Sequence, residues 1–190
     1  MEKSIVLAIA VLWMCFLFYW ARESRGQKST ERMESQGSRQ LRTILMLAAM
    51  LLLLVPPRQL HFLHLQMLPE GSWRPWLALL LTVAGMGVSV WARVHLGRNW
   101  SQAVTVKEEH ELIRSGPYRL LRHPIYTGFL LAVLGMVALD GIFASLLGFG
   151  LVALALVKKI LLEEQWLAEH FGERWLEYRK DSRKLIPYVY

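Results

Sequence analysis

The residues best suited to chemistry lie where two apolar segments of the sequence meet polar chain. His123 stands directly before the apolar segment 125–139, and Glu163 follows the apolar segment 142–157. Only two residues separate these segments, so they can pair only as a tight antiparallel helical hairpin. Counted from that turn, His123 is about 17 residues back and Glu163 about 22 residues on, and at about 1.5 Å per residue both reach similar depth. The spacing predicts that an imidazole and two carboxylates, those of Glu163 and Glu164, converge at the cytosolic end of the hairpin. Ionisable groups at membrane depth indicate a functional site.

The chain around His123 has the composition of a turn that leads into a helix. Gly116-Pro117-Tyr118 is a turn signal, and Pro124 suits the first turn of a helix, where its missing N–H costs little. His123 is therefore expected near a helix N-terminus, beside backbone N–H groups that favour an anion such as a ligand carboxylate. A histidine that only caps the helix at the membrane interface is an equally open interpretation.

Glu163 is followed directly by Glu164. Neighbouring residues on a helix point about 100° apart, so the two carboxylates cannot act as a dyad on one face. We expect one of them to face a pocket and the other to face solvent. The alternative is a pair of surface glutamates that form ion pairs with Lys158 and Lys159.

The composition places these residues in a membrane protein. Hydrophobic residues make up 54% of the 190 residues, charged residues make up 19%, and the mean hydropathy is +0.30. An ordinary soluble domain is about 45–50% apolar and about 25% charged. The apolar content excludes a disordered chain, and the single cysteine, Cys15, excludes a disulfide scaffold.

Five apolar segments are long enough, or nearly so, to cross a bilayer. They are residues 4–20, 43–55, 73–92, 125–139 and 142–157, with Asp140-Gly141 as the turn of the last pair. The second segment is short, and we expect it to borrow length from residues 60–68. The sequence predicts an all-α integral membrane protein with five transmembrane helices and a C-terminal helical hairpin. Four spans, with the second segment lying in the interface, is the alternative.

Three polar stretches, 21–42, 92–124 and 158–190, hold 19 of the 22 lysine and arginine residues. Five alternating spans place all three on one side, and the positive-inside rule makes that side cytosolic, with the N-terminus outside. The membrane would be the plasma membrane of a prokaryote or the endoplasmic reticulum of a eukaryote. The net charge of +7 is thus explained by a membrane face, and no nucleic-acid partner is expected.

The chain divides into an N-terminal part, 1–92, with three spans and a C-terminal part, 93–190, with the hairpin 124–157 and a cytosolic tail. Residues 21–42 are expected to form a mobile polar linker. Residues 163–180 are amphipathic, and we expect them to continue the fifth span and then to lie on the membrane surface. No set of metal ligands is recognised in the sequence.

A series of short motifs runs through residues 92–190 in a fixed order. They are Leu96-Gly97-Arg98-Asn99-Trp100-Ser101, His110-Glu111-Leu112-Ile113, Gly116-Pro117-Tyr118, Arg122-His123-Pro124-Ile125-Tyr126, Glu163-Glu164, Phe171-Gly172, Trp175, Tyr178 and Leu185-Ile186-Pro187. In this order they resemble the isoprenylcysteine carboxyl methyltransferase family, which is related to phospholipid N-methyltransferases. The chain is similar to a small prokaryotic-type member. The first 90 residues match only in being hydrophobic spans.

The resemblance implies an integral-membrane methyltransferase with a cytosolic pocket for S-adenosyl-L-methionine. The implied cofactor-binding residues are His110, Glu111, Leu112, Ile113, Tyr118, His123, Pro124, Ile125, Tyr126, Glu163 and Glu164. Lys159 takes the position of the basic residue that contacts substrate in the family. The family often has arginine there, and lysine offers a point charge instead of a planar fork. No catalytic residue is implied beyond alignment and desolvation, because a carboxylate nucleophile is already ionised near pH 7.

The expected reaction is methyl transfer to a lipidic acceptor, such as the carboxylate of an isoprenylated cysteine in a small molecule or a peptide. Methylation of a phospholipid amine is an alternative that would require a base to remove a proton. A membrane NADPH-dependent reductase is another, because sterol reductases carry a similar Arg-His-Pro-x-Tyr element and the chain ends Pro187-Tyr188-Val189-Tyr190. A non-catalytic membrane adaptor whose charged tail binds a partner is the third.

Overall fold

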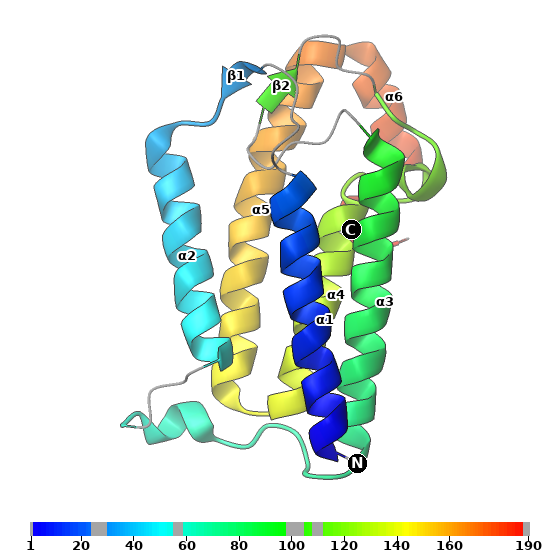
Figure 1. Ribbon diagram of the computed structural model, residues 1–190. Coiled ribbons are helices and arrows are strands. Elements are labelled where there is room, and N and C mark those ends of the chain that lie inside the picture. Colours follow the sequence, from blue (N-terminus) through cyan, green and yellow to red (C-terminus); the bar gives the residue numbers. More distant parts are fainter. Residues whose placement is uncertain (1, 24–29, 55–58, 98–104, 108–111, 188–190) are drawn as a thin grey trace.

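The computed structural model describes residues 2–23, 30–54, 59–97, 105–107 and 112–187. Five apolar helices run side by side along one axis of the molecule (Figure 1). They are α1 (Glu2–Glu23), α2 (Gln36–Leu54), α3 (Trp73–Leu96), α4 (Pro124–Asp140) and α5 (Phe143–Phe171). Among the described residues, α1, α2, α3 and α5 are long and apolar enough to cross a membrane, and α4 is a shorter apolar helix of 17 residues. The predicted class, an all-α integral membrane protein, is confirmed.

Shorter elements lie at the two ends of the helices (Figure 1). They are β1 (Thr30–Met33), β2 (Thr105–Lys107), the 3₁₀ helices η2 (His61–His64) and η4 (Gly116–Arg119), and α6 (Glu173–Asp181). The strands β1 and β2 pair antiparallel at the end from which α5 projects. Two of the three basic stretches of the sequence are therefore joined at the same end of the molecule.

The hairpin of α4 and α5 is present as predicted. Gly141 ends α4 in the left-handed conformation, with φ of 63°, which glycine adopts without a Cβ penalty. The side chain of Arg74 covers the turn: its Nε donates to the carbonyl oxygen of Ala138 at 3.2 Å and its Nη2 to that of Leu139 at 2.8 Å. These bonds satisfy carbonyl groups that the end of α4 leaves without helical partners.

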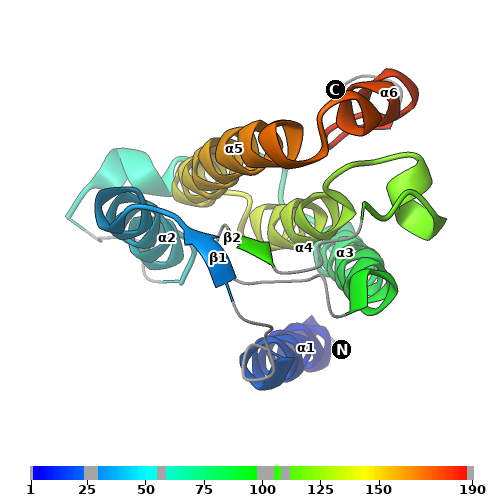
Figure 2. The same cartoon turned by 90° about the horizontal axis from the view of Figure 1, so that it is seen from above.

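The helices α3 and α4 cross at glycines. A Cβ atom on Gly85 would lie only 2.4 Å from the carbonyl oxygen of Gly128, and a Cβ on Gly128 would lie 2.4 Å from the carbonyl oxygen of Gly85. The hydroxyl of Ser89 donates across the same crossing to the carbonyl oxygen of Ile125 at 3.0 Å. Small residues allow this approach, which fixes the start of α4 against α3. Seen from above, α4 lies between α3 and α5 (Figure 2).

The helix α2 stands upright beside α5, along the same direction as the other apolar helices (Figures 1 and 2), which favours a fifth span over an interfacial helix. It begins at Gln36, inside the stretch that we expected to be a polar linker. Ser35 caps this start, because its hydroxyl accepts a bond from the N–H of Ser38 at 3.3 Å. The extra length thus comes from the N-terminal side, and the expected extension into residues 60–68 is wrong: α2 ends at Leu54, and that segment contains η2.

The tail continues the fifth span as far as Phe171, as predicted, and then packs back against the protein; its place on the membrane surface stays a prediction. Gly172, with φ of 54°, ends α5 and redirects the chain into α6. Two aromatic side chains of α6 point inward, Trp175 with 1% and Tyr178 with 5% exposed, whereas Leu176 is 52% exposed. The sequence pattern of the tail correctly indicated an apolar face. It did not reveal that this face packs against the rest of the protein.

The glycine crossing predicts a position-specific loss of stability. Gly85→Val should lower the free energy of unfolding by about 1–3 kcal/mol or more, because the new side chain must push the backbone of α4 away. Gly87→Val, in the same helix, is the matched control, since a Cβ there meets nothing within 4 Å. Thermal unfolding in detergent, followed by tryptophan fluorescence, measures the difference. Equal melting temperatures for the two variants would contradict the packing described.

Candidate functional site

The imidazole of His123 is held between two carboxylates at the start of α4. Its Nδ1 lies 3.5 Å from Glu163 Oε2 and its Nε2 lies 3.4 Å from Glu164 Oε1. Only 7% of His123 is exposed, and Nε2 has no aligned hydrogen bond within the described part of the chain. The predicted convergence of His123 and Glu163 across the hairpin is therefore present. His123 also precedes Pro124 at the start of the helix, as predicted.

Glu163 is the more accessible of the two carboxylates. Its side chain is 19% exposed, against 8% for Glu164. It accepts a 2.7 Å hydrogen bond from the hydroxyl of Tyr126 and lies 3.8 Å from the ammonium of Lys159. The same ammonium lies 5.2 Å from the centre of the Tyr126 ring, at the distance of a cation–π contact. Glu163, Tyr126 and Lys159 thus form one interlocked group on α4 and α5.

Glu164 is buried and has two cationic partners. It accepts a 2.6 Å hydrogen bond from Arg122 Nε, and Lys184 Nζ lies 3.6 Å away. We expected one of the two adjacent glutamates to face solvent, and that expectation is wrong. Although the two side chains leave the helix in directions about 100° apart, both reach the same imidazole. One ring nitrogen of His123 lies near Glu163 and the other lies near Glu164.

The C-terminal segment closes the start of α4. The backbone N–H of Arg122 donates to Arg183 O at 2.7 Å, and that of His123 donates to Lys184 O at 3.1 Å. The hydroxyl of Thr127 adds a 2.7 Å bond to Leu185 O. We expected the N–H groups next to His123 to be open to a ligand carboxylate. For the N–H groups of Arg122 and His123 this expectation is wrong, because the chain itself supplies their acceptors.

Tyr118 is a packed residue. It is 5% exposed and clusters with Ala92 and Ile125, with Ile113 packed against them. Its carbonyl oxygen accepts a 2.6 Å bond from the hydroxyl of Tyr178 on α6. Burial raises the pKa of both phenols, that of Tyr178 to about 12, so both hydroxyls keep their protons at neutral pH. The turn of η4 is thereby fixed between α3 and α6.

The remaining predicted cofactor residues differ in burial, and two of them are not described by the structure. Leu112 is half-buried, and Pro124 and Ile125 are buried within the packed helices. His110 and Glu111 lie outside the described residues. The side chains that form a polar cluster are thus His123, Tyr126, Glu163 and Glu164, together with Lys159.

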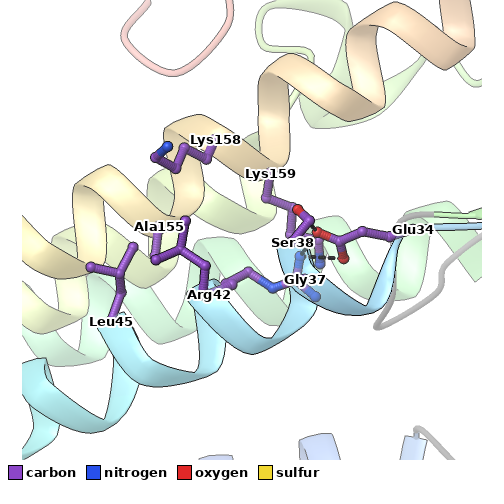
Figure 3. A pocket seen from close by; sticks show the side chains of 9 residues that line it. Glu34, Gly37, Ser38, Arg42, Leu45, Ala155, Lys158 and Lys159 are labelled. Atoms are coloured by element: carbon purple, nitrogen blue, oxygen red, sulfur yellow. Dashed lines mark hydrogen bonds and ion pairs between the residues drawn. The ribbon is translucent and has the colours of Figure 1, made fainter.

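A pocket of about 240 Å³ opens between α2 and α5, next to this cluster (Figure 3). It is lined by Glu34, Gly37, Ser38, Leu41, Arg42, Leu45, Ala155, Lys158 and Lys159. Sequence reasoning did not identify the α2 residues of this set. Glu34, Ser38 and Arg42 follow one another at intervals of four, which is the spacing of one helical face. That signal was present, but the stretch was interpreted as a linker.

Comparisons with known proteins agree with the resemblance in the motifs. Residues 77–169 match the family model "Isoprenylcysteine carboxyl methyltransferase (ICMT) family". A probable protein-S-isoprenylcysteine O-methyltransferase of rice (Oryza sativa subsp. indica) is 30% identical over 125 residues, which are 64% of this chain and 65% of the relative. The protein-S-isoprenylcysteine O-methyltransferase of Schizosaccharomyces pombe is 37% identical over 101 residues, or 52% of this chain and 43% of the relative.

A solved structure has the same fold. It is that of a eukaryotic intramembrane Ras methyltransferase, with a TM-score of 0.56 and 18% sequence identity, and the match covers 83% of this chain and 55% of that chain. The chain thus spans slightly less than two thirds of the rice relative and about half of the solved structure.

The two glutamates should differ in their effect on stability. Glu164→Gln leaves the guanidinium of Arg122 buried without its counter-charge and should destabilise the protein by about 3–5 kcal/mol. Glu169→Gln, on the exposed side of the same helix, should change stability by less than about 0.5 kcal/mol. Chemical or thermal unfolding in detergent compares them. If the two variants are equally stable, Glu164 does not hold the cluster together.

Proposed function

We propose that the chain, whose residues 77–169 match the isoprenylcysteine carboxyl methyltransferase family, is an S-adenosylmethionine-dependent carboxyl methyltransferase of the membrane. The proposed acceptor is the carboxylate of an isoprenylated cysteine or a similar lipidic acid. The observation that carries the proposal is the group of Glu163, Tyr126 and Lys159 beside His123. These residues lie inside the matched region and combine an accessible carboxylate, an aromatic face and a cation.

The chemistry of this group fits S-adenosylmethionine. The partly exposed carboxylate of Glu163 suits the ammonium of the cofactor. The ring of Tyr126 has a cation near its face, and a face that attracts an ammonium also suits a sulfonium. His123 and Glu164 would hold Glu163 and Tyr126 in place. When bound, the cofactor supplies an electrophilic methyl group, and the roles of His110 to Ile113 in holding it stay a prediction.

The protein's own contribution to the reaction would be alignment and desolvation. Its residues would hold the acceptor carboxylate in line with the methyl group that the bound cofactor would supply. No proton has to move, so no general base is required. Lys159, which is only 8% exposed, would place the acceptor carboxylate away from bulk water, where alignment counts most.

The proposed orientation has the N-terminus outside and the C-terminus in the cytosol. The supporting observation is that the β1–β2 pair, the projecting end of α5 and the helix α6 all lie at the same end of the molecule (Figure 1). The basic stretches of the sequence belong to this end. A polar cofactor would then reach the cluster from the cytosol, while the tail of the acceptor stays in the bilayer.

Glu163→Gln should weaken the binding of S-adenosylmethionine by roughly ten-fold to a hundred-fold, because a contact to a charged group is worth about 1.5–3 kcal/mol. The fold should persist, since glutamine retains an oxygen that can accept the bond from Tyr126. Isothermal titration calorimetry of detergent-purified protein measures the change. Glu169→Gln is the control, because it removes the same charge at an exposed position of the same helix. Absence of binding to the folded wild-type protein would refute the cofactor assignment.

The acceptor class can be tested separately by transfer of a radiolabelled methyl group. We expect label on N-acetyl-S-farnesylcysteine and none on its carboxamide or on phosphatidylethanolamine. Label on the amine lipid alone would replace the carboxyl reaction by N-methylation. Oxidation of NADPH in the presence of sterol acceptors, without any methyl transfer, would instead favour a reductase.

A further inference from the structure

We propose that Arg42 on α2 is the specificity-determining residue for the acceptor, and that its guanidinium binds the acceptor's carboxylate together with Lys159. This inference rests on the proposed function, because it takes the acceptor to be a carboxylate with an apolar tail. It assigns a role to a helix that none of the sequence motifs include.

The pocket between α2 and α5 has one charged end and one apolar end. Arg42, Lys158 and Lys159 supply three cations, against one carboxylate from Glu34. Leu41, Leu45 and Ala155 supply the apolar lining. A volume of about 240 Å³ accommodates a small anionic head and the first part of a tail. The chemistry that fits is therefore an amphiphile with a single anionic group.

The guanidinium of Arg42 is held in place from one side only. Its Nη1 donates to both carboxylate oxygens of Glu34, at 2.7 and 2.5 Å, and the hydroxyl of Ser38 donates to the same carboxylate at 2.5 Å. The Glu34 side chain is 2% exposed, so its position is fixed by packing, and 19% of the Arg42 side chain remains exposed. Among the described residues, Nη1 is the one nitrogen of Arg42 with a side-chain acceptor. The other edge of the planar fork can thus bind a carboxylate.

Lys159 connects this pocket to the proposed methyl-transfer site. It lines the pocket, and its ammonium lies 3.8 Å from Glu163 and 5.2 Å from the ring of Tyr126. Figure 3 shows Lys159, Ser38, Glu34 and Arg42 gathered between the two helices. A carboxylate bound by Arg42 and Lys159 would therefore lie next to the group to which we assign the methyl donor.

The position of Arg42 also accounts for the lysine at position 159. A lysine alone gives a point charge, which does not distinguish a carboxylate from other anions by shape. Arg42 supplies the planar pair of N–H donors from the opposite helix. Recognition of the anion would thus be divided between α2 and α5, and it would depend on the two helices being packed together.

The experiment measures binding of N-acetyl-S-farnesylcysteine and of its carboxamide to the full chain in phosphatidylcholine nanodiscs. Arg42→Lys keeps a counter-charge for Glu34 but removes the fork, and Arg42→Met removes both. Arg39→Met, one turn away on the same helix and outside the pocket lining, is the matched control. We expect Arg42→Lys to weaken binding of the acid by about ten-fold or more, with the affinity for the carboxamide and for S-adenosylmethionine unchanged. Arg42→Met, which also leaves the buried Glu34 without its counter-charge, should weaken binding of the acid at least as strongly. Arg39→Met should behave as wild type.

A second pair of variants tests the pocket without altering any charge. A Cβ on Gly37, which lines the pocket, meets nothing within 4 Å, and the same is true of Gly150. Gly37→Leu should therefore fold, narrow the pocket and raise the KM for the acid but not for S-adenosylmethionine, whereas Gly150→Leu should leave both unchanged.

Each result of these measurements decides the inference. Equal affinity of the acid for wild type and Arg42→Lys, or displacement of the acid by phosphatidylglycerol at equal mole fraction, would overturn it. Binding that prefers the acid over the carboxamide and depends on Arg42, in a protein that methylates neither, would support the site and refute the methyltransferase function.

Discussion

The tight turn between α4 and α5 is the constraint on which the arrangement of the site depends. Arg74 bonds to the last carbonyl groups of α4, and Gly141 adopts the conformation that reverses the chain. The register set there is transmitted along two stiff helices to their opposite ends, about 25 Å away at 1.5 Å per residue. Insertion of one residue into α5 would rotate its far end by about 100°, and Glu163 would no longer face His123.

The need to compensate buried charge explains why Glu163 and Glu164 have different surroundings. A buried carboxylate requires a partner, because desolvation of an unpaired charge costs several kcal/mol. Arg122 and Lys184 provide that partner for Glu164, and the C-terminal segment that carries Lys184 also accepts the N–H groups at the start of α4. With these demands met by the chain, Glu163 is the carboxylate that stays partly exposed. Under the proposed function, the structural role would thus fall to Glu164 and the ligand-binding role to Glu163.

The sequence predicted what depends on local pattern and on spacing along one helix pair. The hairpin, the helix start at Pro124 and the meeting of His123 with Glu163 follow from residue counts and from the chemistry of proline and glycine. Contacts between elements distant in sequence were missed. Arg122 contacts Ser182, Tyr178 contacts Tyr118, and Lys184 contacts Glu164. No periodicity encodes such pairs. The start of α2 was missed for a related reason: it is polar, and its helical state depends on the cap by Ser35 and the ion pair of Glu34 with Arg42.

The helix α5 contributes to the polar cluster of His123 and Glu163 on one side and lines the pocket toward α2 on another. Under the proposed function, this arrangement would suit a reaction between a water-soluble donor and a lipid. The cationic side chain of Lys159 reaches both sides, since it contacts Glu163 in the polar cluster and lines the pocket toward α2. An acceptor carboxylate drawn to that ammonium would leave water before it meets the donor, which strengthens each electrostatic contact it makes. Its apolar tail would not have to leave the bilayer at all. A soluble protein would have to enclose that tail in a cavity of its own, whereas here the membrane provides the apolar surroundings and the helices need to enclose only the reacting head.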